Sequence, residues 1–267
     1  MTAELKDFYE QVSRVFIEKE KWTKKYKIEN WRLAYVKRAF EALDLKRGDA
    51  FLDIGVGFSG YTVIEAGMRG IRSIGIDISS QAARNARRNA KHVFPPRFDF
   101  VDFCVCSASN LPFRADVFSK VCSIAVLEHV PDDEQAVSEI SRVLQAQGKA
   151  FISVPNCYSR ILPIFILHQK VVDREAGHLR RYKAEVLADI FQRKGIKLLN
   201  VSYHSHLTKL LQYFLQLIFP QMRNPKSRIW WKLEEKDARL HDIATGTKMS
   251  LTLIKSGNRH LDERPSS

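Results

Sequence analysis

The chain has 267 residues, of which 45% are apolar and 27% are charged, and its formal net charge is +13. This length and composition are typical of one large globular domain with a well-buried core, and the positive charge favours a polyanionic partner without selecting one. The longest apolar runs, 161–167 and 210–220, are shorter than the roughly 18–20 residues that span a bilayer, which excludes a membrane-spanning protein.

Residues 4–44 are predicted to be helical, because apolar side chains recur there at helical spacing. From residue 50 onward, strand patterns alternate with helical stretches. The first five predicted strands are 50–55, 72–79, 98–108, 120–130 and 148–155. The predicted helices between them are a stretch that ends at Met68, a serine-capped helix at 79–93, and a helix at 131–145 that opens with proline and acids. Such alternation is typical of a parallel sheet covered by helices on both faces.

The rest of the chain is predicted to close this sheet. A helix at 183–195 precedes two strands, at 196–204 and 248–256, and the last strand is expected to run antiparallel to the others. The fold class is therefore α/β, a three-layer αβα sandwich around a mostly parallel seven-stranded sheet. The predicted parts are an N-terminal helical cap at 1–45, a main domain at 46–204 with 248–256, an insert at 205–247, and a disordered tail at 257–267.

The insert at 205–247 is too long for a hairpin turn and too apolar for a disordered linker. It combines apolar helical stretches and aromatic residues with basic residues at 222–228. This composition predicts a helical segment that either lies on an anionic membrane or covers a binding pocket as a lid.

The segment "FLDIGVGFSGYT" at 51–62 holds the most informative motif. Gly55, Gly57 and Gly60 form a G-x-G-x-x-G loop after a strand, and Asp77 follows at the end of the next strand. A dinucleotide would place its pyrophosphate beside Asp53, which costs Coulomb energy. S-adenosylmethionine (SAM) carries a sulfonium and an ammonium and has no phosphate. The two carboxylates therefore favour SAM over a nicotinamide dinucleotide.

Five segments in order resemble the class I SAM-dependent methyltransferases of the small-molecule and lipid type, with a methyltransferase-11-like domain. They are "LDIGVG", "GIDIS", "SASNLPF", "VLEHVPD" and "EISRVLQAQGKAFISVPN". The resemblance extends over about residues 45–203 and implies a Rossmann-like fold. It implies SAM as the methyl donor, S-adenosylhomocysteine (SAH) as the product, and no metal ion.

The resemblance also assigns roles to individual residues. It places Asp53, Gly55 and Gly57 at the methionine part of SAM, Asp77 at the ribose, Ile78 against the adenine, Ser107 and Ala108 at the adenine edge, and Ala125 on the floor. The family usually has an acid where this chain has Ser107, which can still form hydrogen bonds but carries no charge.

Two polar groups are candidates for the acceptor side. His129 follows the fourth strand, where the acceptor is expected, and it is either a general base or a structural histidine. Glu128 directly precedes His129 and is open to the same two interpretations, a catalytic group or a structural residue. The segment "GHLRRY" supplies His178, Arg180, Arg181 and Tyr182, which could hold an anionic acceptor or form a helix entry with surface pairs.

The favoured function is methylation, with oxygen as the preferred target, of a small molecule, a lipid or a lipid-linked glycan. The alternatives are an RNA methyltransferase, which the charge suggests, and a SAM-binding module without catalysis. The four cysteines, Cys104, Cys106, Cys122 and Cys157, lack paired metal-ligand spacing, and the first residues show no apolar signal segment. We therefore expect reduced thiols in a cytoplasmic protein that also binds peripherally to membranes if the insert contacts lipid.

Overall fold

The computed structural model describes residues 6–11, 30–94, 99–205, 214–215, 237 and 243–257. Most of the predicted insert 205–247 and nearly all of the predicted tail 257–267 lie outside these residues. The same holds for 12–29 of the predicted N-terminal cap. The limits of the four predicted parts therefore stay predictions.

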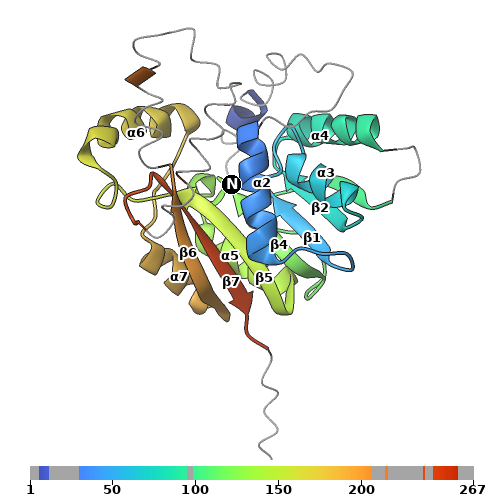
Figure 1. Ribbon diagram of the computed structural model, residues 1–267. Helices are drawn as coiled ribbons and strands as arrows, with labels where there is room; N and C mark the ends of the chain where they lie inside the picture. Colours follow the sequence, from blue (N-terminus) through green and yellow to red (C-terminus); the bar gives the residue numbers. More distant parts are fainter. Residues whose placement is uncertain are drawn as a thin grey trace, which may run out of the picture.

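A seven-stranded sheet forms the centre of the molecule, in the order β3-β2-β1-β4-β5-β7-β6 (Figure 1). The strands are β1 (Ala50–Ile54), β2 (Arg72–Asp77), β3 (Val101–Val105), β4 (Phe118–Ile124), β5 (Leu144–Pro155), β6 (Ile196–His204) and β7 (Lys248–Lys255). The first five strands pair in parallel, and β7 is antiparallel to both β5 and β6. This arrangement confirms the predicted fold class. Because the chain leaves β1 toward β2 and later returns to β4 on the other side, ligands are expected where β1 and β4 end.

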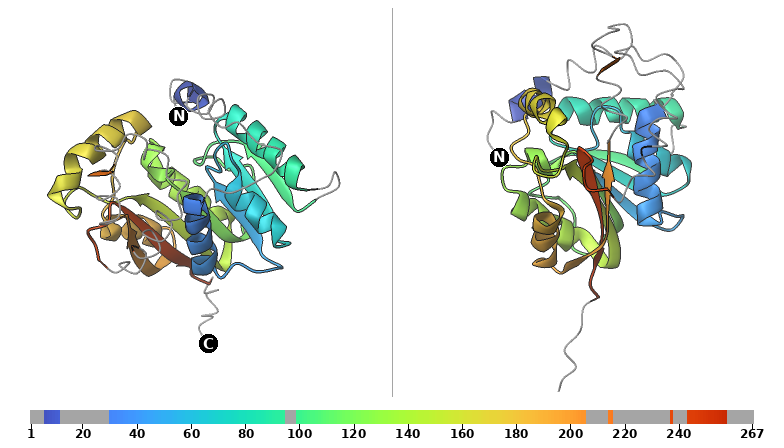
Figure 2. Two further views of the ribbon diagram at one scale, coloured as in Figure 1. Left: turned by 45° about the horizontal axis from the view of Figure 1, so that its top comes forward. Right: turned by 60° about the vertical axis from the view of Figure 1, so that its left-hand side comes forward.

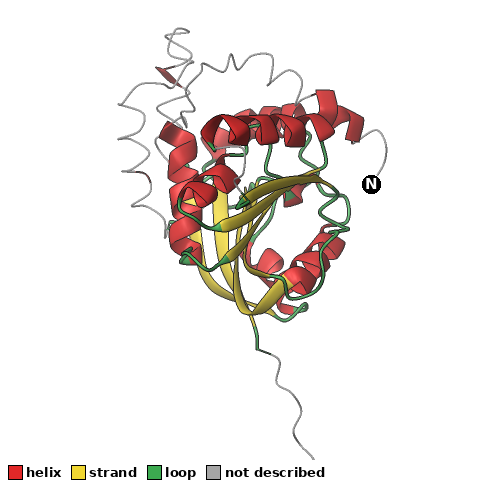
Figure 3. Cartoon of the chain, turned by 90° about the vertical axis from the view of Figure 1, so that its right-hand side faces the viewer, coloured by secondary structure: helices red, strands yellow, loops and turns green. Residues whose placement is uncertain are grey.

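Helices cover both faces of the sheet. They are α2 (Asn30–Leu43), α3 (Tyr61–Met68), α4 (Ser80–Val93), α5 (Asp133–Val143), α6 (Pro163–Ala176) and α7 (Ala184–Gln192), with a short 3-10 helix, η1 (Leu127–His129). Helices lie on both sides of the strands (Figure 3). One layer holds α2, α3 and α4, and the opposite layer holds α5 and α7 (Figure 2). Helix α6 and the short helix 6–11 lie at the edge of the sheet where the parallel strands end (Figure 1).

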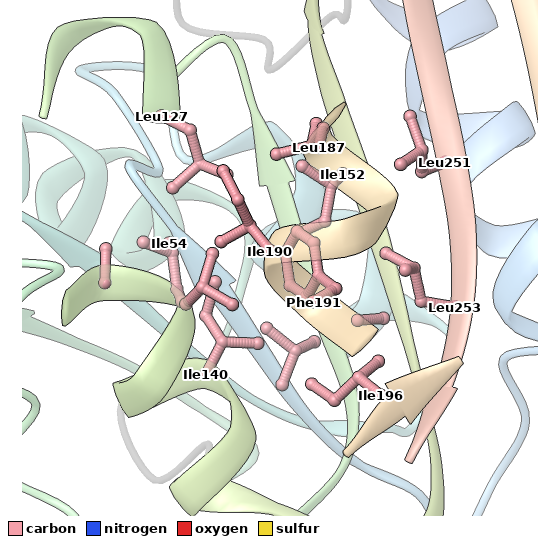
Figure 4. Close-up of a cluster of buried hydrophobic side chains, with 14 of the residues drawn as sticks. Ile54, Leu127, Ile140, Ile152, Leu187, Ile190, Phe191, Ile196, Leu251 and Leu253 are labelled. Atoms are coloured by element: carbon pink, nitrogen blue, oxygen red, sulfur yellow. The ribbon is translucent and has the colours of Figure 1, made fainter. Parts of the chain in front are cut away.

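The largest apolar cluster fills the space between the sheet and the α5–α7 layer (Figure 4). Ile140 of α5 and Leu187 and Phe191 of α7 pack there with Ile152 of β5 and Leu251 of β7, and all five are fully buried. Burial of one such side chain contributes about 1.5–3 kcal/mol. This cluster joins the closing strands to the parallel part of the sheet and so gives its carboxyl edge a rigid base.

The fourth strand is shorter than predicted. It ends at Ile124, whereas the pattern predicted a strand to residue 130. The segment Leu127–His129 forms η1, and the side chain of Leu127, its first residue, is fully buried. A continuous apolar run cannot distinguish a strand from a buried turn, which explains the difference.

Helix α6 was not predicted. Its apolar residues Ile164 and Leu167 are 69% and 77% exposed, so they do not follow the pattern of a core-facing helix. The sequence nevertheless holds its boundary signals, with Pro163 in the first turn and Gly177 in the left-handed conformation at φ 71°.

Within the residues that the structure describes, no helix is long and apolar enough to cross a membrane.

Candidate active site

The glycine loop begins where β1 ends. Gly55 and Gly57 have φ angles of 75° and 65°, in the left-handed region that favours glycine. The amides of Gly55 and Val56 each donate to the carbonyl of Ile76 at 2.8 Å, which fixes the loop to the end of β2. A Cβ on Gly55 would lie 2.2 Å from Cγ2 of Val126, whereas a Cβ on Gly57 would meet nothing within 4 Å. Gly55 therefore permits the close approach of the segment after β4, and Gly57 borders open space.

A cavity of about 260 Å³, called the larger cavity below, lies at the carboxyl ends of β1 and β2. Seven of the eight residues predicted to bind the cofactor line it: Gly55, Gly57, Asp77, Ile78, Ser107, Ala108 and Ala125. His129 lines it as well. The structure thus brings together residues that the sequence distributes over four strand ends.

Asp77 is held in position by backbone amides. Its Oδ2 accepts a hydrogen bond from the amide of Gly57 at 2.9 Å, and its Oδ1 accepts one from the amide of Ser79 at 2.9 Å. Burial raises the pKa of this carboxyl, and the amide hydrogen bonds oppose the rise. The carboxylate is therefore fixed at the cavity wall with its second lone pairs available to a ligand.

Asp53 is the predicted cofactor residue that does not line the larger cavity. It is 3% exposed and accepts a hydrogen bond from the hydroxyl of Thr62 at the start of α3. Successive side chains of a strand point to opposite faces, and Asp53 points into the α3 layer. Burial raises the pKa of its carboxyl to about 7, with a smaller contribution from the nearby charge of Asp77. Its contact with a ligand in this cavity is therefore indirect.

Ser107 and its neighbours form the wall beyond β3. The hydroxyl of Ser107 accepts a hydrogen bond from the amide of Ser109 at 3.1 Å, and Ser107 also pairs with Asn110 through an isolated β-bridge. The turn is thereby fixed, and Ser107 and Ala108 face the same cavity as Asp77. Since Ser107 carries no charge, Asp77 supplies the acidic group of this wall.

No sequence pattern predicts the role of helix 6–11 at this site. Tyr9 lines the larger cavity, and its ring packs edge to face against that of His129 at 5.3 Å. Glu10 accepts hydrogen bonds from the amides of Ser80 and Gln81 at 2.7 and 3.2 Å, at the start of α4. Such contacts join parts of the chain about seventy residues apart, so no local pattern predicts them.

His129 lies on η1 at the boundary of the larger cavity. Its Nδ1 donates to the carbonyl of Gly177 at 3.2 Å, and its ring contacts that of His178 at a centroid distance of 4.8 Å. Burial lowers the pKa of His129 to about 4. The ring is therefore neutral at pH 7, and its Nε2 carries a lone pair.

A second cavity of about 150 Å³, called the smaller cavity, borders the larger one at Ala125. Its polar wall residues are Glu128, Ser153, Gln169, His178, Arg181, Thr247 and Lys248. Glu128 is fully buried, and neither of its carboxylate oxygens has a hydrogen-bond partner among the described residues. Burial raises the pKa of this carboxyl to about 8.

The four residues of the "GHLRRY" segment do not form one cluster. His178 and Arg181 line the smaller cavity and both contact Asp173 of α6, at 2.6 Å in each case. Arg180 instead pairs with Asp133 at the start of α5 at 2.5 Å. The hydroxyl of Tyr182 donates to the same Asp133 at 2.7 Å and is buried there. Arg180 and Tyr182 therefore stabilise the fold away from the cavity, and of these four residues only His178 and Arg181 line it.

Known proteins that resemble the chain agree with this geometry. Residues 52–152 match the family model for a methyltransferase domain. Over 114 residues the chain is 29% identical to the methyltransferase GfsG of Streptomyces halstedii, an overlap of 43% of this chain and 40% of that protein. Overlaps with two further curated relatives cover 39% and 32% of their lengths. The chain thus spans well under half of these relatives.

Two solved structures share the fold over most of the chain. One is the [4+2]-cyclase SpnF, with a TM-score of 0.61 at 17% identity, covering 89% of this chain and 85% of that one. The other is the geranyl diphosphate C-methyltransferase of Streptomyces coelicolor A3(2), in complex with Mg²⁺, geranyl diphosphate and SAH. Its TM-score is 0.60 at 17% identity, covering 84% of this chain and 79% of that one.

The seven-stranded sheet, the glycine loop and the family match are those expected of a class I SAM-dependent methyltransferase domain. The family match covers residues 52–152. Over 118 residues the chain is also 32% identical to the norajmaline N-methyltransferase of Rauvolfia serpentina, an overlap of 44% of this chain and 39% of that protein. The structural neighbour from Streptomyces coelicolor A3(2) binds SAH, the product of methyl transfer from SAM.

Proposed function

We propose that the protein transfers the methyl group of SAM to an oxygen atom of a small molecule, a lipid or a lipid-linked glycan. The observation that carries the proposal is the junction of the two cavities at Ala125. The larger cavity has walls suited to SAM, and the smaller one offers an acceptor a site directly beside it. A reaction by in-line displacement requires such adjacency, because the acceptor must approach the methyl group opposite to the sulfur.

The wall of the larger cavity fits SAM group by group. Asp77 accepts hydrogen bonds from the ribose hydroxyls, and Ile78 packs against the adenine. Ser107 and Ala108 border the adenine edge, and the backbone at Gly55 and Gly57 approaches the methionine part. The carboxylate of Asp77, and that of Asp53 beneath the wall, favour the cationic sulfonium and ammonium groups over a pyrophosphate. In this proposal Asp53 acts through its effect on the loop position and through the charge of its ionised form, since it does not line the cavity.

The smaller cavity supports an acceptor with both polar and apolar parts. Its apolar wall comes from Ile124, Val154, Pro155 and Val172, opposite the polar groups around Glu128. Beside it, Ile164, Leu167 and Val171 of α6 are 69%, 77% and 44% exposed and recur at helical spacing. This exposed apolar stripe supports an apolar or membrane-borne acceptor. The predicted lid or membrane contact of the insert 205–247 falls mostly on residues outside those described.

The decisive test has two arms. Calorimetry measures SAM, SAH and NADH binding, and we expect SAM and SAH to bind and NADH not to bind. Labelled SAM is then incubated with separate small-molecule, lipid and tRNA extracts, and we expect label in the small-molecule or lipid fraction. Label in tRNA alone would identify an RNA methyltransferase, and SAM binding with no transfer to any fraction would identify a binding module.

His129→Ala provides the catalytic readout. Because the ring lies at the boundary of the larger cavity and beside His178 of the smaller one, we expect at least a roughly tenfold fall in kcat with SAM affinity kept within about twofold. His92→Ala is the matched control, since His92 is an exposed residue of the last turn of α4. An unchanged kcat in His129→Ala would return His129 to a structural role.

A further inference from the structure

Glu128, His129 and His178 form a compact group at the boundary of the two cavities. One ligating atom from each residue lies within 4.8 Å of the others. We propose that these three residues bind a divalent transition-metal ion, which holds the acceptor's reacting oxygen beside the methyl group. This inference deepens the proposed function and rests on it for the role of the metal, but not for its binding. It departs from the sequence-based expectation of no metal.

The first observation that points to a cation is the state of Glu128. Its side chain is fully buried, it lines the smaller cavity, and no described residue donates a hydrogen bond to either oxygen. A buried carboxyl group without hydrogen-bond partners costs free energy in either protonation state, and buried carboxylates in proteins are usually paired or bound to metals. A cation in the cavity removes this cost.

The second observation is the orientation of the two imidazoles. The Nδ1 of His129 donates to the carbonyl of Gly177, and the Nδ1 of His178 donates to Oδ1 of Asp173 at 2.6 Å. Among the described residues, no hydrogen bond engages Nε2 of either ring, so each ring has this nitrogen left for a ligand. Histidines that bind metals usually donate their other N–H to a carbonyl or a carboxylate, as both of these rings do.

The group is also preassembled by the backbone. The amide of Leu179 donates to the carbonyl of Glu128 at 2.8 Å, which joins the segment after α6 to η1. The amide of His178 donates to the carbonyl of Asp173 at 2.9 Å. Metal bonds of about 2.0–2.2 Å at tetrahedral angles hold ligating atoms about 3.3–3.6 Å apart, so the separations between the three side chains need to shorten by at most about 1.5 Å. Metal binding therefore requires no rearrangement of the fold.

The ligand set and the nearby charges define the class of metal. Two imidazoles and one carboxylate suit zinc, iron and similar divalent ions, and they leave coordination positions open for a substrate. Arg181 and Lys248 also line the smaller cavity. Arg181 is balanced by Asp173, with nitrogen–oxygen contacts of 2.6 and 2.7 Å, so its charge opposes a metal ion only weakly. Lys248 contacts the ring of Tyr35, with its ammonium 5.2 Å from the ring centroid.

The chemical step is balanced without an oxidant or a reductant. The acceptor hydroxyl binds at an open position of the ion, which lowers its pKa, and its proton leaves to water. The oxygen forms the new bond to the methyl carbon, the S–CH₃ bond breaks, and its electron pair stays on sulfur to give SAH. His129 then acts as a ligand, which also accounts for the kcat loss expected of His129→Ala.

Metal binding is tested directly on the full chain after removal of metal with a chelator. Titration with Co²⁺ should give visible absorption bands that saturate at one ion per chain, and calorimetry should show competing Zn²⁺ binding. In Glu128→Gln and His178→Ala we expect metal affinity at least about tenfold lower, and in His92→Ala unchanged affinity. A thiolate charge-transfer band, or saturation unchanged in both ligand variants, would place the ion elsewhere and overturn the proposal.

Two further measurements keep the outcome decisive. If a ligand variant fails to fold by circular dichroism, the wild-type protein should still show a Zn²⁺-dependent rise in Tm, and no rise and no Co²⁺ band would refute the metal site. SAM affinity is measured in parallel by calorimetry. If the metal-free protein binds SAM and transfers the methyl group, the proposed function stands and the proposed role of the metal ion is refuted. If the protein binds the metal ion but not SAM, the metal site stands and the proposed function is refuted.

Discussion

The larger and the smaller cavity share Ala125 but are built in different ways. The larger cavity lies at the ends of β1 and β2, where it is lined by two glycines with left-handed backbone and by a carboxylate that a backbone amide of the same loop holds. Side chains from η1, β5, α6 and β7 form the smaller one. A site built on a glycine loop needs particular residues at short spacing in the sequence. A site built from side chains of several elements needs residues that only folding brings together. This difference explains why one cavity is readable as a motif and the other is not.

The largest expected effect is that of Gly55→Ala on the larger cavity. The added Cβ meets Val126 at 2.2 Å and the backbone has φ 75°, so we expect a loss of about 2–5 kcal/mol of unfolding free energy and no measurable SAM binding. Gly57→Ala is the control, since it adds only backbone strain of about 1–2 kcal/mol. Urea unfolding and calorimetry measure both. If both variants lose the same unfolding free energy, the close contact between Gly55 and Val126 does not contribute to stability beyond the backbone strain.

The next largest effect concerns the smaller cavity. Arg181→Ala leaves the nearly buried Asp173 without its main partner, so we expect a loss of about 3 kcal/mol of unfolding free energy. Arg180→Ala breaks a pair whose arginine is 31% exposed, and we expect about 1 kcal/mol or less. Urea unfolding compares the two neighbours. If Arg180→Ala proves the more costly, the smaller cavity is not organised around Asp173.

A smaller effect is expected from the carboxyl beneath the larger cavity. Because burial raises the pKa of Asp53 to about 7, the folded protein holds a proton that the unfolded chain releases near pH 4. Stability from this group is thus fully present below about pH 4 and is lost as the pH rises through about 7. Between pH 5 and 7, the unfolding free energy of Asp53→Asn should rise relative to wild type by on the order of 2 kcal/mol. Parallel pH dependences would mean that Asp53 titrates normally.

The smallest effect sharpens the role of the wall carboxylate. Asp77→Ala removes the acceptor for the ribose hydroxyls, and we expect SAM affinity to fall by roughly tenfold or more, with little change in Co²⁺ affinity. Asp99→Asn, at an exposed position before β3, is the control. Calorimetry measures both ligands. A parallel loss of SAM and metal binding would show that the two cavities are coupled, against the division drawn above.

The predicted strands agree closely with the observed ones where turn residues bound a short apolar run. The segments at β1, β6 and β7 differ from the prediction by at most one residue at an end. The prediction failed at the carboxyl edge, where β4 ends early and α6 presents apolar residues to the surface. Such segments are shaped by the neighbours they meet, so local periodicity carries little information about them.

The site shows the same division in finer detail. The spacing of Gly55, Gly57 and Asp77 is sufficient to predict their meeting, because parallel strands end at one edge of a sheet. The direction of the Asp53 side chain was not predictable, since it depends on which face of β1 lies against α3. It was also not predictable that the adjacent residues Arg180 and Arg181 form ion pairs at different places, because their partners Asp133 and Asp173 lie on different helices.

The sequence by itself determined the order of the strands along the chain, the glycine loop and the acid that lines the larger cavity. These features depend on backbone conformation and on side chains within about thirty residues of one another. Tertiary structure alone decided that Tyr9 lines the larger cavity, and that Glu128, His129 and His178 each bring a ligating atom within 4.8 Å of the others. The physical reason is that burial and hydrogen bonding act between neighbours in space, and for these side chains the neighbours are distant in the chain.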